Sequence, residues 1–197
     1  MKRWVKVREE TYPIKLLADC KKYSDDTTFS LSPFAHPAID AEIKSANEKF
    51  HLQITIADPI WTDENGSTQN GGYDHRLAME ALNRFGVVYG SALMRRENDG
   101  KIVSGLPVKS FEQEFQACAQ GLVEALQRKL KRGTAGTRLL VYARDYVIHT
   151  MDFSLGDVVN AALARLKDQI DSSAFDTIYF VDQNDEFFTY TKSGQSS

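Results

Sequence analysis

Three polar side chains alternate with apolar ones along Lys49–Ala57: His51, Gln53 and Thr55. Alternate residues of a strand project from the same face, so these three side chains lie side by side while the residues between them face a core. An amide such as that of Gln53 can ligate a metal ion or orient a water molecule. A polar strand face is also common where a sheet meets solvent or a covering helix. The pattern is therefore compatible with a functional cleft and with an ordinary polar face.

The run Phe50-His51-Leu52-Gln53-Ile54-Thr55-Ile56-Ala57-Asp58 resembles the motif strand of diverged members of the restriction-endonuclease-like (PD-(D/E)XK) superfamily. In that motif, a helix carrying a glutamate precedes a strand that bears an acidic residue or a glutamine, one further residue and then a lysine. The resemblance implies that Glu42 matches the helical glutamate, on a short helix opening at Pro37 and ending near Asn47. Gln53 then matches the acid-or-amide position.

The sequence departs from this motif at two points. Thr55 occupies the lysine position, and no aspartate is evident on a separate upstream strand. The cation can move to a neighbouring helix in such folds, so the resemblance implies that Arg76 or Arg84 takes the place of the lysine.

The chemistry that the resemblance implies is metal-assisted hydrolysis of phosphodiester bonds. Mg²⁺ is a hard cation that takes oxygen ligands, and it activates water and stabilises charge on the phosphate. Glu42, Gln53 and Asp58 are the expected ligands of Mg²⁺, and Arg76 the cation that steadies the developing negative charge. An inactive descendant that kept the fold for binding is an alternative, because one fold hosts many functions.

Four basic residues lie near the end of the longest predicted helix: Arg128, Lys129, Lys131 and Arg132. Cations are favourable at a helix C-terminus through the helix dipole alone. The same side chains are suited to contacts with nucleic-acid phosphates. Both interpretations stay open at the level of sequence.

Several classes of site are excluded by spacing. The acidic loop from Asp58 to Gly72 lacks the ligand spacing of a calcium-binding loop. The stretch from Lys131 to Thr137 has glycines after a helix and before a strand, whereas a phosphate-binding loop runs from strand to helix. The four histidines and two cysteines show no zinc spacing, and neither a nucleophile elbow nor a dinucleotide fingerprint is present.

The composition is that of a globular chain rather than a disordered one. The chain has 197 residues, of which 42% are hydrophobic and 26% charged, and a net charge of −3. It has no apolar run of about eighteen residues, and its basic start lacks the apolar stretch of a secretion signal. Two cysteines are too few for a disulfide framework. We therefore expect a cytoplasmic protein without membrane segments.

The periodicity and turn residues predict one α/β domain over residues 1–191, with a central mixed sheet flanked by helices, and a disordered tail over 192–197. Predicted helices cover Tyr12–Tyr23, Pro37–Asn47 and Asp74–Phe85, with two more that are capped by Ser110 and Ser154. Predicted strands cover Lys49–Ala57, Val87–Arg95, Lys101–Ser104, Arg138–Ala143, Thr177–Val181 and Glu186–Thr191.

Two functional hypotheses follow from the sequence. The first is a diverged, metal-dependent nuclease-like protein that acts on or binds nucleic acid. The second is a non-catalytic interaction module, such as an accessory or immunity-type subunit, supported by the incomplete motif, the negative net charge and the aromatic residues Phe187, Phe188 and Tyr190.

Overall fold

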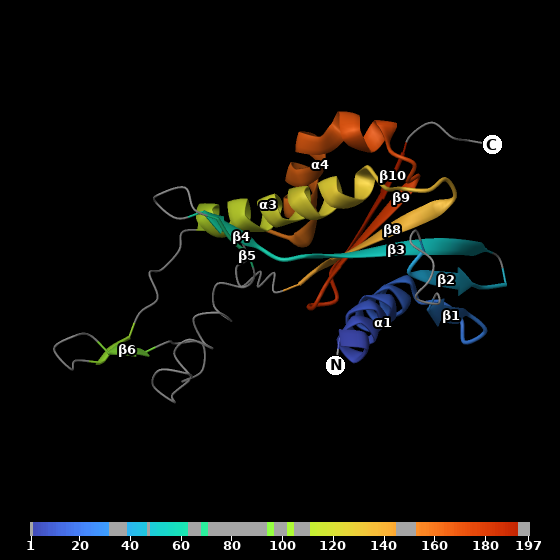
Figure 1. The fold of residues 1–197 in the computed structure, drawn as a ribbon, viewed down its shortest axis with the longest axis horizontal. Helices are drawn as coiled ribbons and strands as arrows, with labels where there is room; N and C mark the ends of the chain where they lie inside the picture. Colours follow the sequence, from blue (N-terminus) through green and yellow to red (C-terminus); the bar gives the residue numbers. More distant parts are fainter. Residues whose placement is uncertain are drawn as a thin grey trace.

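The computed structural model describes residues 2–31, 39–46, 48–62, 68–70, 94–96, 102–104, 111–144 and 153–192. Within these residues, six strands form one sheet in the order β1-β2-β3-β8-β9-β10. The strands are β1 Thr28–Leu31, β2 Ala41–Lys44, β3 Lys49–Ala57, β8 Thr137–Ala143, β9 Thr177–Asp182 and β10 Phe187–Thr191. The helices are α1 Lys2–Lys21, α3 Phe111–Leu130 and α4 Leu155–Ser172 (Figure 1).

The sheet is mixed. Strands β1, β2 and β3 form an antiparallel meander, β3, β8 and β9 are parallel, and β10 returns antiparallel to β9. The connections between the parallel strands contain α3 and α4, as parallel pairing requires long crossovers. Two short hairpins lie outside this sheet, formed by β4 Ile60–Thr62 with β5 Thr68–Asn70 and by β6 Met94–Arg96 with β7 Ile102–Ser104.

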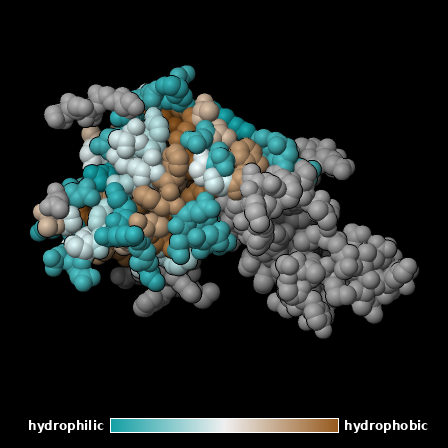
Figure 2. Space-filling model, turned by 180° about the vertical axis from the view of Figure 1, so that it is seen from behind, coloured by the Kyte–Doolittle hydropathy of each residue, from teal (hydrophilic) through white to brown (hydrophobic). Residues whose placement is uncertain are grey.

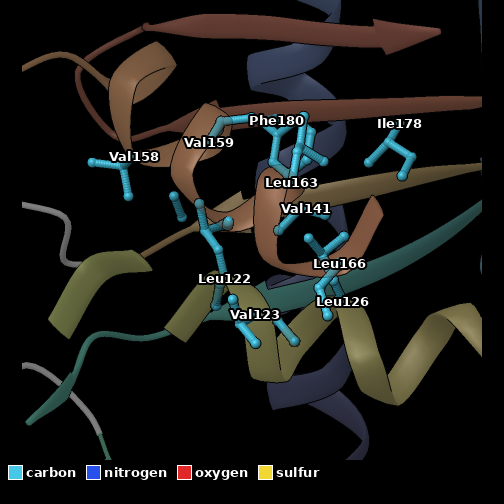
Figure 3. Close-up of a cluster of buried hydrophobic side chains, with 14 of the residues drawn as sticks. Leu122, Val123, Leu126, Val141, Val158, Val159, Leu163, Leu166, Ile178 and Phe180 are labelled. Atoms are coloured by element: carbon cyan, nitrogen blue, oxygen red, sulfur yellow. The ribbon is translucent and has the colours of Figure 1, made fainter. Parts of the chain in front are cut away.

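One face of the sheet packs against α3 and α4. Leu122 and Leu126 of α3 and Leu163 of α4 meet Val141 and Phe180 of the central strands, and all five are buried (Figure 3). The apolar residues of both helices recur at helical spacing, which places them on one side of each helix. Ser154 and Asp157 form a capping box at the start of α4, which fixes where this helix begins.

The opposite face packs against α1. Leu17 is fully buried there, in a cluster that includes Ile43 of β2, Leu52 of β3 and Leu140 of β8. The described part of the chain is therefore a three-layer structure with helices on both faces of the sheet (Figure 1). The expected α/β fold with a central mixed sheet is confirmed.

The predictions for β3, β8, β9 and β10 hold to within one residue, and those for the side of the sheet formed by β1 and β2 do not. Strand β3 has the predicted bounds, and β8 begins one residue earlier than predicted. The helix expected over Pro37–Asn47 is wrong for the part that is described, because Ala41–Lys44 is strand β2. Alternate residues Ala41 and Ile43 are fully buried while Glu42 and Lys44 face away, which is the period of a strand.

Two further differences concern the N-terminal part of the chain. Helix α1 begins at Lys2 rather than near Tyr12, so Pro13 lies inside the helix instead of in its first turn. Residues Thr28–Leu31, for which no strand was predicted, form β1 and pair antiparallel with β2.

Some expectations lie outside the described residues, namely the helix over Asp74–Phe85, most of the strand over Val87–Arg95 and the tail beyond Lys192. Lys192 itself still donates from its main-chain N–H to Asp176 O, at 3.0 Å.

None of the described helices is long and apolar enough to cross a membrane. Seen from behind, the described surface exposes an apolar area among hydrophilic side chains (Figure 2).

The packing of α1 gives a first prediction. Leu17→Ala should lower the free energy of unfolding by about 2–5 kcal/mol, because it leaves a cavity between α1 and the sheet. Lys15→Ala, an exposed position of the same helix, should change it by less than about 0.5 kcal/mol. Urea denaturation measures both, and equal stability of the two variants would contradict the placement of α1.

Candidate functional site

Glu42 and His51 face each other across the β2–β3 pair. They are register partners, so both side chains project from the sheet face that α3 and α4 cover further along. The Nε2 atom of His51 lies 3.1 Å from Oε2 of Glu42, and Nζ of Lys49 lies 3.1 Å from the same oxygen. Hydrogen bonds from Lys49 and from His51 hold the pKa of the Glu42 carboxyl below its ordinary value. All three side chains are partly exposed, so this group is accessible to a ligand.

Asp40, directly before β2, provides a second carboxylate on the same strand pair. Its main-chain N–H donates to Leu52 O at 2.8 Å, and its Oδ2 accepts from the N–H of Ile54 at 2.7 Å. The carboxylate therefore lies beside the section of β3 that contains Gln53. Lys129 of α3 places Nζ 3.5 Å from the same Oδ2.

Gln53 and Thr55 lie under the end of α3 instead of facing solvent. Gln53 is 3% exposed and Thr55 8% exposed. The Nε2 group of Gln53 donates to Arg132 O at 3.5 Å, and Arg128 donates from Nη2 to Ile56 O at 3.3 Å. Strand β3 thus contacts the last turn of α3 through Ile56 O and the residues that follow the helix through Gln53.

The cluster predicted from sequence at the end of α3 is divided by these contacts. Arg128 and Lys129 bind groups on β3 and before β2, and the side chains of Arg128, Lys131 and Arg132 are exposed. Lys44 and Lys49 add two cations at the far end of the β2–β3 hairpin. On this side of the described chain, Lys129 lies beside Asp40 and Lys49 beside Glu42, although the whole chain carries a charge of −3.

Asp58 lies apart from this group. It follows β3, and both its carboxylate oxygens accept from Arg144, at 2.7 and 2.8 Å. It is five positions along an extended chain from Gln53, which corresponds to about 16 Å. The structure therefore does not bring Asp58 together with Gln53, and Arg76 lies outside the described residues.

Glu42 and Gln53 lie on the same face of the β2–β3 pair, as the proposed site requires. Glu42, however, is on a strand and not on the helix that the resemblance implied. Within the described ranges, no group of three or more histidine, cysteine, aspartate or glutamate side chains is arranged to hold a metal ion.

Asp40 extends the site beyond the residues selected from sequence, and the structure brings it together with Lys129 and the Glu42–His51 pair. Asp40 has a sequence signal, because it directly precedes the alternating residues Ala41–Lys44. Lys129 was selected only as part of a basic cluster. Its contact with Asp40 could not be foreseen, because the two residues are 89 positions apart in the sequence. Comparisons of the chain with protein-family models, with curated proteins and with solved structures found no match.

The contact between Asp40 and Ile54 gives a second prediction. Asp40→Ala should lower the free energy of unfolding by about 1–3 kcal/mol, because the N–H of Ile54 loses its acceptor in a buried strand. Asp40→Asn keeps an oxygen at this position and loses mainly the ion pair with Lys129, which at partly exposed sites contributes at most about 1 kcal/mol. Chemical denaturation of both variants separates the two effects, and equal losses would show that the Ile54 bond contributes nothing.

Proposed function

We propose that this chain is a nuclease-like protein that holds a nucleic-acid phosphate at the corner formed by β2, β3 and the end of α3. The observation that carries the proposal is the meeting of Asp40, Lys129 and the Glu42–His51 pair on one accessible side of the sheet. Carboxylate, imidazole and ammonium groups are the side chains that phosphodiester hydrolysis uses.

The cations at this corner bind the phosphate. Lys129, Lys49 and Lys44 come from separate elements but the same side of the sheet, so their fields add over one surface. Lys131 and Arg132 extend it beyond the end of α3. Neutralising phosphates releases counterions from a nucleic acid, which makes such a surface effective in spite of a negative net charge.

Asp40 supplies the oxygen atoms suited to Mg²⁺. This ion often keeps several waters and is held by one or two protein oxygens together with the phosphates of a substrate, so a small protein ligand set fits it. When bound, Mg²⁺ polarises the phosphate and lowers the pKa of a bound water. Gln53 is buried, so its role is to hold the residues after α3 in place through Arg132 O. Asp40 faces the ligand.

His51 transfers the proton. Imidazole is the side chain most often used for this purpose, and the contact with Glu42 fixes the orientation of its ring. Glu42 stabilises the imidazolium that forms when His51 accepts a proton from the attacking water. The water oxygen bonds to phosphorus, the P–O bond to the leaving oxygen breaks, and that oxygen takes a proton from solvent. Glu42 is thus a positioning residue in this proposal, in place of the helical glutamate that the sequence suggested.

The resemblance to the restriction-endonuclease-like superfamily is compatible with these roles. Gln53 keeps the acid-or-amide position of the motif strand, and Asp40 is an aspartate ahead of it. Lys129 is a cation on a neighbouring helix, the place in which the resemblance implied Arg76 or Arg84.

A second candidate function is a non-catalytic interaction module. The observation that favours it is that Asp40 and Glu42 already lie beside cations of the same chain, at 3.5 and 3.1 Å. A corner whose carboxylates are neutralised in this way can serve to bind a polyanion or a protein without reacting with it.

The proposal predicts that binding and cleavage respond to different residues. Lys129→Met should weaken binding of a fluorescent DNA or RNA oligonucleotide about tenfold, the loss of one charge-assisted contact. His51→Ala should leave binding unchanged and slow cleavage in Mn²⁺ or Mg²⁺ by about 100-fold or more, as for loss of a general base. Fluorescence anisotropy and gel analysis of the products measure the two effects.

Lys167→Met is the matched control, because Lys167 lies on α4 and pairs with Asp171. It should change neither binding nor cleavage. Binding without cleavage in the wild type would favour the non-catalytic function. Absence of binding, or equal losses in Lys129→Met and Lys167→Met, would contradict a phosphate site at this corner.

A further inference from the structure

Strand β10 ends the sheet with an edge that carries no charged residue. Its sequence is Phe-Phe-Thr-Tyr-Thr, and among the described residues no strand pairs with its outer side. Proteins usually protect an edge strand with lysine, proline or a bulge, because its main-chain groups pair readily with another strand. The described residues of β10 contain none of these features.

The main-chain groups that point outward can be assigned from the hydrogen bonds around β10. Asp182 N–H donates to Glu186 O just before the strand, and Lys192 N–H donates to Asp176 O just after it. Antiparallel pairs alternate between bonded and non-bonded residues, so Phe188 and Tyr190 bond to β9. The N–H and C=O groups of Phe187, Thr189 and Thr191 therefore point away from the sheet.

A groove runs along β10 on the side of α4. It has a volume of about 380 Å³ and is lined by apolar and aromatic residues, among them Leu163, Phe188 and Tyr190, and by polar ones, among them Lys167 and Thr189. Phe188 is half-buried and packs edge-on against Phe180 at a ring-centre distance of 6.2 Å. Apolar surface is thus available beside the same edge that offers the main-chain groups.

We propose that a second copy of this chain pairs antiparallel with β10 around a twofold axis at Thr189. This register joins the outward groups of Thr189 with those of Thr189 of the second copy, and those of Phe187 with Thr191. It also places Phe188 opposite Tyr190 of the second copy, on the groove side and in a non-bonded pair, where side chains approach most closely. Two aromatic pairs form with no like charges facing each other.

The strand is self-complementary, which is the reason for choosing a second copy over a different partner. An isologous contact requires that one surface fits itself, and an uncharged strand centred on a small side chain does so. Thr189 is exposed and pairs across the sheet with Tyr179 of the α1 face, so its side chain projects from the face opposite to Phe188 and Tyr190.

The test is the molar mass of the chain in solution by light scattering after size-exclusion chromatography. Wild type should be a dimer. Thr189→Lys and Thr189→Glu should each halve the molar mass, because like charges then meet at the axis, and an equal mixture of the two should restore the dimer. Ser30→Lys, on the edge strand β1 at the other end of the sheet, should remain dimeric.

Circular dichroism shows that the variants are folded. A monomeric wild type would overturn the proposal and leave the edge to another partner. A dimer that survives Thr189→Lys, or monomeric variants that do not combine on mixing, would overturn an axis at Thr189.

Discussion

The rest of the structure depends on how the polar side chains of β3 are satisfied inside a sheet that is covered on both faces. Leu52 and Ile54 pack under α1, and this is the ordinary burial of an apolar strand face. Gln53 and Thr55 point the other way and are also buried. Buried polar groups need hydrogen-bond partners. The end of α3 contributes to this at Arg132 O, so the polar face of β3 helps to fix where α3 lies.

This arrangement brings charges together as a consequence of packing. The last turn of α3 is rich in cations, which the helix dipole favours, and its position over β3 places Lys129 beside Asp40. Partly exposed ion pairs of this kind contribute little to stability. They can therefore exchange partners with an incoming phosphate at small cost. The bidentate pair of Arg144 with Asp58 differs, because it joins the ends of two neighbouring parallel strands and is best explained as structural.

The parts of the fold that could be predicted are those whose pattern is long and regular. Strand β3 alternates over nine residues, and α3 and α4 keep helical spacing over 20 and 18 residues. Strand β2 has only four residues, and Pro37 before it favours a helix as much as a strand. Residues Ala41–Lys44 form a strand because they pair with β1 and β3. This pairing cannot be read from the local sequence. Because of this pairing, Glu42 lies on a strand instead of the predicted helix and faces His51. The spacing of the two residues along the sequence does not indicate this contact.

The most direct test of the phosphate site is nuclear magnetic resonance of the labelled chain during titration with a short oligonucleotide. The proposal predicts that the amide signal of Ile54, the signals of Lys129 to Arg132 and the imidazole signals of His51 shift together and saturate at one concentration. Shifts that cluster instead around Asp58 and Arg144, or along β10, or no shifts at all, would contradict a phosphate site at the corner of β2, β3 and α3.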